Sequence, residues 1–346
     1  MVENKKLVLM PIIVHLLIVA VVLLGTVRLS AQHAFTEINY RKADSSAHAL
    51  KGHLLHDLPS LSAKLTNGLD TEVEKFRAIF TWVAINITND RALFVMNKRN
   101  REKLSGNAAA LDAWNREMSA KTMRTLIEQR RTVCTGYAYL VRKLAIHAGI
   151  QCEIIHGYGR TVESNIGGQG IVNHSWNAVR LDSTWYLCDP TWASGAYDRE
   201  KREVVNKYEP SYFLPAPELF IRNHYPLDSA WIMLALKPTL REFLDGPIIY
   251  VNAFRLDIHP QSPTAMHVLV KKSETVLFSF NGPAGLEKDL RIMVGQKQLR
   301  TQAEATLMEH GRSGYRMAYK FANKGKYNVH ILGAEGPTVT WRVIVE

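Results

Sequence analysis

The sequence holds only 3 cysteines among its 346 residues, and none of them forms a closely spaced pair. The C-x-x-C spacing of structural zinc sites is missing and the 13 histidines are scattered, so no metal site is predicted. The glycine-rich stretch at residues 167–170 lacks the following helix and lysine that a phosphate-binding loop requires. The sequence therefore predicts a protein that uses no metal, nucleotide or other cofactor.

The sequence also lacks signs of disorder and of nucleic-acid binding. Charged residues make up 22% and apolar residues 47%, a balance typical of a folded globular protein. The formal net charge of +11 favours acidic partners such as membrane surfaces and anionic polymers. The densest basic runs, at residues 98–103 and 199–202, contain no interleaved aromatic side chains. We interpret them as solvated faces, and nucleic acid is not a predicted partner.

The first 31 residues have the parts of an export signal. Lys5 and Lys6 precede an apolar run at residues 7–27, and Ala31 marks a small-residue cleavage site. The run is also long enough to cross a bilayer, because ~20 apolar residues suffice. Two interpretations stay open: a cleaved signal peptide, or a membrane anchor retained through residues 7–27. Both predict an extracytoplasmic protein that is periplasmic, secreted or membrane-anchored.

The rest of the chain is long enough for two domains, because one core rarely grows beyond ~250 residues. Residues 32–69 are polar and broken, with one helical signal at 47–55, and are predicted to form a leader segment. Residues 70–235 form the predicted catalytic domain. Residues 237–346 consist of about seven short alternating segments, which predict a β-sandwich for binding, orientation or a purely structural role. Its expected strands are 248–256, 266–270, 275–280, 290–294, 315–321, 327–332 and 338–345.

The catalytic domain opens with an amphipathic helix. Thr71 and Glu74 have the spacing of a capping box at its start, and residues 85–90 are expected to break into a loop. Residues 91–120 are rich in Asn, Lys, Arg and Ala. This composition predicts an exposed helical insertion.

A second helix is predicted to begin at Cys134. Apolar residues recur behind it at helical spacing until Gly149, where a helix is expected to end, and Thr132 or Thr135 is the expected cap. Cys134 therefore stands at the N-terminal end of a buried helix. The unpaired amides and the positive end of the helix dipole favour a thiolate at that position.

Three strands are expected after this helix, at residues 152–156, 175–181 and 184–188. A two-residue turn at 182–183 makes the last two a hairpin. Counting outward from this turn places residue 174 opposite residue 191. His174 and Asp189 are therefore expected within about two residues of each other across the hairpin.

Cys134, His174 and Asp189 together have the chemistry of a catalytic triad. A thiol attacks carbonyls as a thiolate, which a nearby imidazole creates, and a carboxylate fixes the orientation of that imidazole. The predicted roles are nucleophile, base and orienting group in this order. For Cys152 and Cys188, a disulfide and a pair of buried thiols both stay open.

Four stretches resemble the transglutaminase-like superfamily, whose catalytic core is related to papain, and together they span residues 70–195. The stretches are residues 75–83 with 89–90, Cys134-Thr-Gly-Tyr-Ala138, Asn173-His-Ser-Trp-Asn177 and Asp189-Pro-Thr-Trp192. The resemblance implies an α+β core in which a nucleophile helix packs on an antiparallel sheet, with the triad at Cys134, His174 and Asp189. The first of these stretches resembles bacterial members, which implies a bacterial exported protein, and the predicted sandwich is similar to the tail of kyphoscoliosis-peptidase-like members.

The resemblance implies a cysteine enzyme that cleaves peptide or side-chain amide bonds through a thioester acyl-enzyme, with hydrolysis favoured. Its expected partner is a protein or peptide substrate in the cell envelope. Two alternatives stay open: a protein-glutamine transferase that crosslinks or deamidates, and a non-catalytic binding module that keeps the fold. Two departures bear on the reaction type. Thr132 stands where many members carry glycine, and the tryptophan that stabilises the oxyanion in animal transglutaminases has no counterpart.

Overall fold

The computed structural model describes residues 35, 38–104, 106–198, 203–295, 297–299, 304–308 and 312–346. Residues Tyr40–Glu346 form one compact unit. The predicted export signal at residues 1–31 lies outside the described residues. Within the described ranges, we find no helix whose length and apolar character would let it cross a bilayer.

The predicted leader folds into two helices, α2 (Arg41–Ala49) and α3 (Leu58–Thr66). The single helix predicted at 47–55 is wrong, because Gly52 adopts a left-handed φ of 80° within it. The new helix α3 starts only at Asp57, whose carboxylate accepts a hydrogen bond from the Ser60 amide. Both helices pack against α4, so this segment is part of the core.

Helix α4 (Glu72–Asn86) begins with the predicted capping box. Thr71 Oγ1 accepts from the Glu74 amide, and the Glu74 carboxylate accepts from the Thr71 amide. The loop predicted at 85–90 is wrong, because the helix continues to Asn86 and is followed by strand β1 (Thr88–Asn89). This strand pairs in parallel with β2 (Arg131–Thr132), and so holds the end of α4 beside the start of the cysteine helix.

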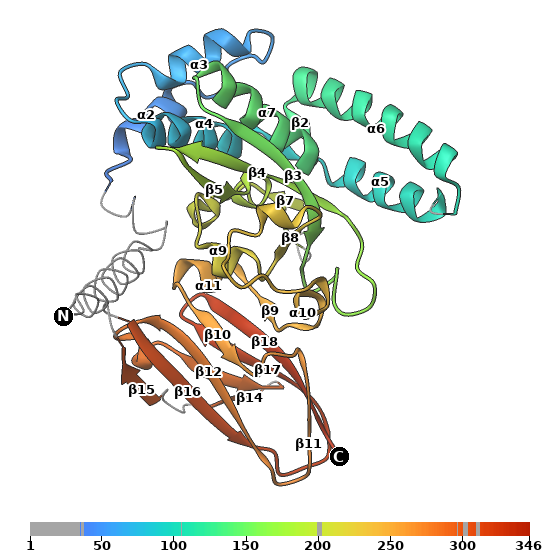
Figure 1. Cartoon of the computed structure of the whole chain (residues 1–346), viewed down its shortest axis with the longest axis vertical. Coiled ribbons are helices and arrows are strands. Elements are labelled where there is room, and N and C mark those ends of the chain that lie inside the picture. The colour runs from blue at the N-terminus through green and yellow to red at the C-terminus, as the bar shows by residue number, and fades with distance from the viewer. Residues whose placement is uncertain are drawn as a thin grey trace, which may run out of the picture. The chain divides into compact units, whose positions relative to one another are not determined.

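The helical insertion is longer than predicted and consists of two helices, α5 (Arg91–Leu104) and α6 (Ala108–Gln129), which pack against each other (Figure 1). Asn107 caps α6 by accepting from the Ala110 amide. Most side chains of the pair are exposed, as the composition predicts.

Helix α7 (Cys134–His147) packs on an antiparallel sheet with the strand order β5-β4-β3-β8. The strands are β3 (Cys152–Gly159), β4 (His174–Leu181), β5 (Thr184–Cys188) and β8 (His224–Pro226). Neither predicted threonine caps the helix: Val133 occupies the cap position and no side chain bonds there. No capping side chain therefore bonds to the backbone amides at the start of α7, beside Cys134.

The hairpin of β4 and β5 has the predicted register. Leu181 pairs with Thr184, and both residues of the turn between them have positive φ, as two-residue hairpin turns require. Cys152 and Cys188 are buried free thiols on the strands that flank β4. Of the two alternatives left open by the sequence, the structure has the pair of thiols.

The C-terminal region is rich in strands and confirms the α+β class with a β-sandwich. Its two sheets have the strand orders β10-β12-β16-β15 and β11-β18-β17-β13-β14, with β9 pairing to β18. The strands are β9 (Ile248–Ile249), β10 (His259–Ser262), β11 (His267–Val270), β12 (Thr275–Pro283), β13 (Arg291–Val294), β14 (Lys297–Leu299), β15 (Glu304–Leu307), β16 (Arg312–Lys320), β17 (Gly325–Gly333) and β18 (Gly336–Val345).

The strand predicted at 248–256 is wrong. Only Ile248–Ile249 pair with β18, and Val251–Arg255 form the short helix α11. An apolar run this short has no period that separates a strand from a buried helix.

Short elements connect the two regions. They are α8 (Pro190–Ala193), β6 (Ala196–Asp198), β7 (Glu203–Val205), α9 (Pro217–Phe220) and α10 (Leu240–Asp245), with single 3-10 turns at Pro210–Tyr212 and Ser229–Trp231. A further 3-10 turn, Leu286–Lys288, lies within the sandwich between β12 and β13. The domain boundaries that we predict at residues 69–70 and 235–237 stay predictions.

Buried polar contacts cross from the sheet region to the segment that precedes the sandwich. The Arg160 guanidinium donates to the carbonyl oxygens of Gly246 and Pro247, the latter at 2.6 Å. The Arg255 Nε donates to Glu209 Oε2 at 2.7 Å. These bonds position residues 246–255 beside the start of β4 and the cysteine helix.

Candidate active site

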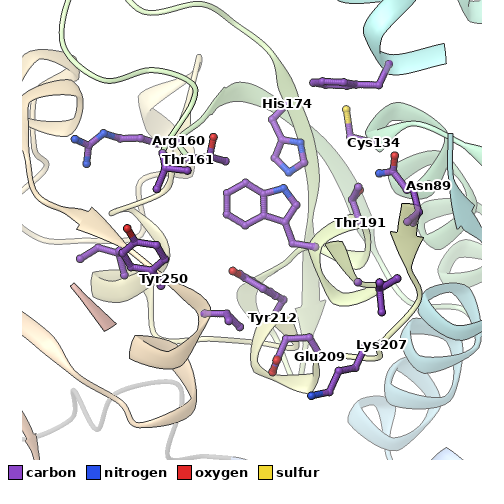
Figure 2. A pocket seen from close by; sticks show the side chains of 18 of the residues that line it. Asn89, Cys134, Arg160, Thr161, His174, Thr191, Lys207, Glu209, Tyr212 and Tyr250 are labelled. Carbon is purple, nitrogen blue, oxygen red and sulfur yellow. The ribbon is translucent and has the colours of Figure 1, made fainter. Parts of the chain in front are cut away.

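Cys134 and His174 line one cavity of about 720 Å³ (Figure 2). Its walls are mainly apolar and include Trp192 and Tyr212. Residues 248–251, from the segment that leads into the sandwich, complete the wall. The cavity has the size and lining of a small-molecule or peptide side-chain site.

Cys134 is the first residue of α7 and is partly exposed to the cavity. Thr132, which replaces the glycine of many relatives, is buried under the same turn. It packs so closely on Gly136 that a Cβ there would lie 1.9 Å from its hydroxyl oxygen. The contact between Thr132 and Gly136 therefore fixes the first turn of α7, and this turn carries the thiol of Cys134.

His174 is the first residue of β4 and joins the other two predicted residues. Its Nε2 lies 2.7 Å from Asp189 Oδ2, and Cys134 lines the same cavity and contributes to the raised pKa of the imidazole. Asp189 is fully buried at the start of α8, where its Oδ1 accepts from the amides of Thr191 and Trp192 at 2.8 and 3.1 Å. The structure thus brings all three predicted site residues together, in the order thiol, imidazole, carboxylate.

The opposite charges of His174 and Asp189 shift the pKa of each group in the direction opposite to the effect of burial. Burial alone would lower the pKa of His174, but the Asp189 charge, its hydrogen bond and Cys134 raise the pKa from 6.5 to about 10. Burial would likewise raise the pKa of Asp189, yet the two imidazoles beside it hold it well below its usual range. At neutral pH, His174 is therefore an imidazolium that donates its Nε2–H to an ionised carboxylate. Such a cation beside a thiol favours the thiolate.

Hydrogen bonds between Gly159 and Asn173, which stand at the two ends of the loop 160–172, fix the start of β4, and we call this pair the clamp. Asn173 accepts from the Gly159 amide at 2.7 Å and donates to the Gly159 carbonyl at 3.0 Å. Its own amide donates to the Gly157 carbonyl at 3.1 Å. Gly159 leaves room for only a hydrogen, because a Cβ there would lie 2.8 Å from the His174 Cβ. The backbone on both sides of the loop thereby positions the imidazole.

His224 belongs to the same cluster and was missed by the sequence interpretation. It is the first residue of β8, pairs with Gly159, and its Nε2 lies 2.9 Å from Asp189 Oδ2. Burial lowers its pKa, the Asp189 contacts oppose this only in part, and the result is about 4. His224 is thus neutral at physiological pH. No local pattern in the sequence marks it.

His174, Asp189 and His224 are residue types that also bind transition metals. Both imidazole nitrogens, however, lie at hydrogen-bond distance from one carboxylate oxygen, at 2.7 and 2.9 Å. Two donors that converge on one acceptor are a hydrogen-bond network. The geometry does not favour three ligands around a common centre.

Asn89 is the second residue that the sequence interpretation did not assign to the site. It ends strand β1, where it is in register with Thr132 of β2, two residues before Cys134. Its side chain lines the cavity and directs its amide group toward the thiol (Figure 2). A side-chain amide at this place can donate a hydrogen bond to a negatively charged oxygen that develops next to the Cys134 sulfur.

Residues 59–190 match the family profile described as the transglutaminase-like superfamily. This part of the chain is therefore similar to a transglutaminase-like domain. Human kyphoscoliosis peptidase is 29% identical to the chain over 224 residues, which are 63% of this chain and 31% of that protein. The chain spans about a third of the length of the curated relatives that it matches first. The resemblance to the transglutaminase-like superfamily, expected from the four sequence stretches, is confirmed, and kyphoscoliosis peptidases are distant homologues of the chain.

Two solved structures are also similar to parts of the chain. A transglutaminase crystal structure covers 53% of this chain and 40% of its own, with 18% identity and a TM-score of 0.28. The filamin domain of Lin-41 covers 28% of this chain and 96% of its own, with 14% identity and a TM-score of 0.17. The residues that match the transglutaminase-like profile precede the β-rich C-terminal region.

Proposed function

We propose that the protein is an extracytoplasmic cysteine enzyme that cleaves amide bonds through a thioester intermediate. The observation that carries the proposal is the 2.7 Å bond between His174 Nε2 and the buried Asp189, with Cys134 on the other side of the ring. This arrangement gives each group of a thiol triad the neighbour that its role needs. The transglutaminase-like domain supports the assignment.

The proposed first half-reaction transfers an acyl group to Cys134. The thiolate attacks an amide carbonyl and forms a tetrahedral intermediate with a negative oxygen. The Cys134 amide and the Asn89 side chain donate hydrogen bonds to this oxygen, a contribution of about 3 kcal/mol for each well-placed donor. His174 then gives its proton to the nitrogen of the breaking C–N bond, the amine leaves, and a thioester remains.

In the second half-reaction a water molecule attacks the thioester carbonyl while the neutral His174 takes up its proton. The C–S bond breaks, a carboxylic acid leaves, and the thiolate–imidazolium pair is restored. An amine in place of water would give transfer. We favour hydrolysis of peptide bonds because two relatives of the chain, the human and mouse kyphoscoliosis peptidases, are named as peptidases. A cell-envelope protein or peptide is the proposed substrate, and residues 7–27 provide export or attachment.

Alkylation of Cys134 by iodoacetamide between pH 4 and 10 tests the proposal, with mass spectrometry to locate the adduct. The triad predicts that reaction persists well below pH 8 and that His174→Ala moves the profile to higher pH, because the thiolate loses its imidazolium. His147→Ala, at the end of α7, is the matched control and should leave the profile unchanged. A profile of an ordinary free thiol in the wild type, near pH ~8.5, would overturn the enzyme proposal and favour a binding module.

A further inference from the structure

Asp189 accepts four hydrogen bonds, and His224 provides the one that a thiol triad does not require. The amides of Thr191 and Trp192 occupy Oδ1, while His174 and His224 share Oδ2. An ionised carboxylate has about four acceptor sites, so this set saturates it. A fully buried charge of this kind costs several kcal/mol unless it is bonded in this way.

The position of the His224 ring is fixed by the rings around it. Phe220 stacks on it with 3.9 Å between centroids and 7° between planes, and Trp192 lies 4.3 Å away. Trp176 meets it edge-on at 5.1 Å. The imidazole is only 1% exposed. The second ring nitrogen, Nδ1, lies 2.6 Å from the side-chain amide of Asn223, so stacking and polar contacts together direct Nε2 at Asp189.

The charge count assigns different protonation states to the two imidazoles. One carboxylate balances one imidazolium, and His174 carries that charge because it also faces Cys134. A second cation beside it would be repelled, and the His174 charge indeed adds to the lowering of the His224 pKa. The other titratable groups that face this cluster are Tyr137 on α7, Cys188 on β5 and Tyr212, and all three stay protonated at neutral pH because burial raises their pKa.

We propose that His224 is a positioning residue that holds Asp189 ionised and directed at His174, and so keeps His174 directed at Cys134. It acts through Asp189 and touches neither the thiol nor the substrate. This inference rests on the proposed triad, since it assigns a role to a residue behind it. His224 stays neutral above about pH 4, and it therefore donates the same hydrogen bond across the working pH range.

The test compares His224→Phe with His224→Gln. Phenylalanine keeps the stacked ring but removes the donor, whereas the glutamine amide reaches as far as Nε2 and keeps it. In the Phe variant Asp189 is bonded and oriented less firmly, so the thiolate–imidazolium pair is less stable and the acid limb of Cys134 alkylation should move up by about one to two pH units, the usual effect of losing a hydrogen bond to a charged group. The Gln variant should restore the wild-type limb. Equal profiles in all three proteins, or an equal shift in both variants, would overturn the proposal.

An NMR measurement on the ¹⁵N-histidine-labelled wild-type chain keeps the proposal testable if the Phe variant does not fold. Two strongly downfield imidazole N–H protons are expected, one from His174 and one from His224, and Asp189→Asn should move both. A His224 signal that Asp189→Asn leaves in place would overturn the proposal. Zinc added to the wild type should leave both signals intact, and their loss with stoichiometric binding would show a metal site instead. Failure of the triad proposal is distinguished by a separate result: the alkylation profile of His174→Ala would then equal that of the wild type.

Discussion

The sheet region around Asp189 and the C-terminal sandwich differ in one class of side chain that they bury. Behind the cavity, three ionisable side chains are buried among aromatic and aliphatic ones: His174, Asp189 and His224. In the sandwich, aromatic and aliphatic side chains alternate with exposed ones, as along β12. A buried charge stabilises the fold only through its partners, whereas a buried apolar side chain contributes through area alone. Substitutions of polar atoms and changes of pH should therefore act on the first region, and changes of volume on the second.

The largest expected effect comes from Asp189→Asn. Asparagine keeps the size of the side chain but removes the charge, and it turns an N–H group toward two imidazole donors. We expect amide turnover to fall about 10⁴-fold, as for the orienting carboxylate of other triads. Initial rates, corrected for the folded fraction by circular dichroism, measure the effect. Asp182→Asn, in the exposed turn of the same hairpin, is the control, and equal rates in the two variants would remove Asp189 from the mechanism.

Asn89→Ala should lower turnover about 10²- to 10³-fold, the loss that follows removal of one oxyanion donor. Alkylation of Cys134 should stay as in the wild type, because the thiolate does not depend on this amide. Asn206→Ala, an exposed residue near the same strand, is the matched control. If Asn89→Ala slowed alkylation as much as turnover, the residue would act on the thiol and not on the oxyanion.

Phe278→Ala probes the sandwich. The ring is fully buried against Trp341, with 5.1 Å between the two centroids. Its removal should lower the free energy of unfolding by about 3–5 kcal/mol, equally at pH 5 and pH 8, because the cavity left behind is apolar. Urea unfolding at both pH values measures this. Leu277→Ala, 48% exposed on the other face of the same strand, should have little effect. A strong pH dependence in the Phe278 variant would break the distinction between the two regions.

A smaller effect is expected for the pH dependence of wild-type stability. Between pH 6.5 and about 4 the unfolded chain protonates the His224 imidazole while the folded chain does not, so stability should fall on acidification. Between pH 6.5 and about 10 the folded chain keeps the His174 proton that the unfolded chain has lost, so stability should fall as pH rises. Each slope is at most about 1.4 kcal/mol per pH unit and proton. Urea midpoints across pH 4–10 should peak near pH 6.5, and His224→Phe should flatten the acid side alone.

The sequence predicts the triad because each member stands at a recognisable point of local structure. Cys134 begins an amphipathic helix, and a two-residue turn sets the register that brings His174 near Asp189. The helix start and the turn both depend on neighbours within a few residues, so the sequence alone is enough to predict them. The alternation of the sandwich strands is local in the same sense.

The features that the sequence did not predict depend on distant contacts. Asn89 reaches the cavity only because β1 pairs with β2 across the inserted helices. His224 reaches Asp189 only because β8 joins the edge of β3. Of the predicted strand at 248–256, only Ile248–Ile249 pair with β18, and Val251–Arg255 form a helix. None of these contacts leaves a period or a motif in the chain.

The clamp between Gly159 and Asn173 separates the loop 160–172 from the imidazole that follows it. Both ends of the loop meet at one glycine, so changes of length or sequence between them need not move His174. Val162 and Ile171 stand more than half exposed on this loop, and Val162 also lines the cavity. Apart from Arg160, Ser164 and Asn165, which bond to Pro247, Asn173 and Gly159, the loop can therefore vary, and a library screen at its exposed positions can change what the cavity admits while the reacting groups stay in place.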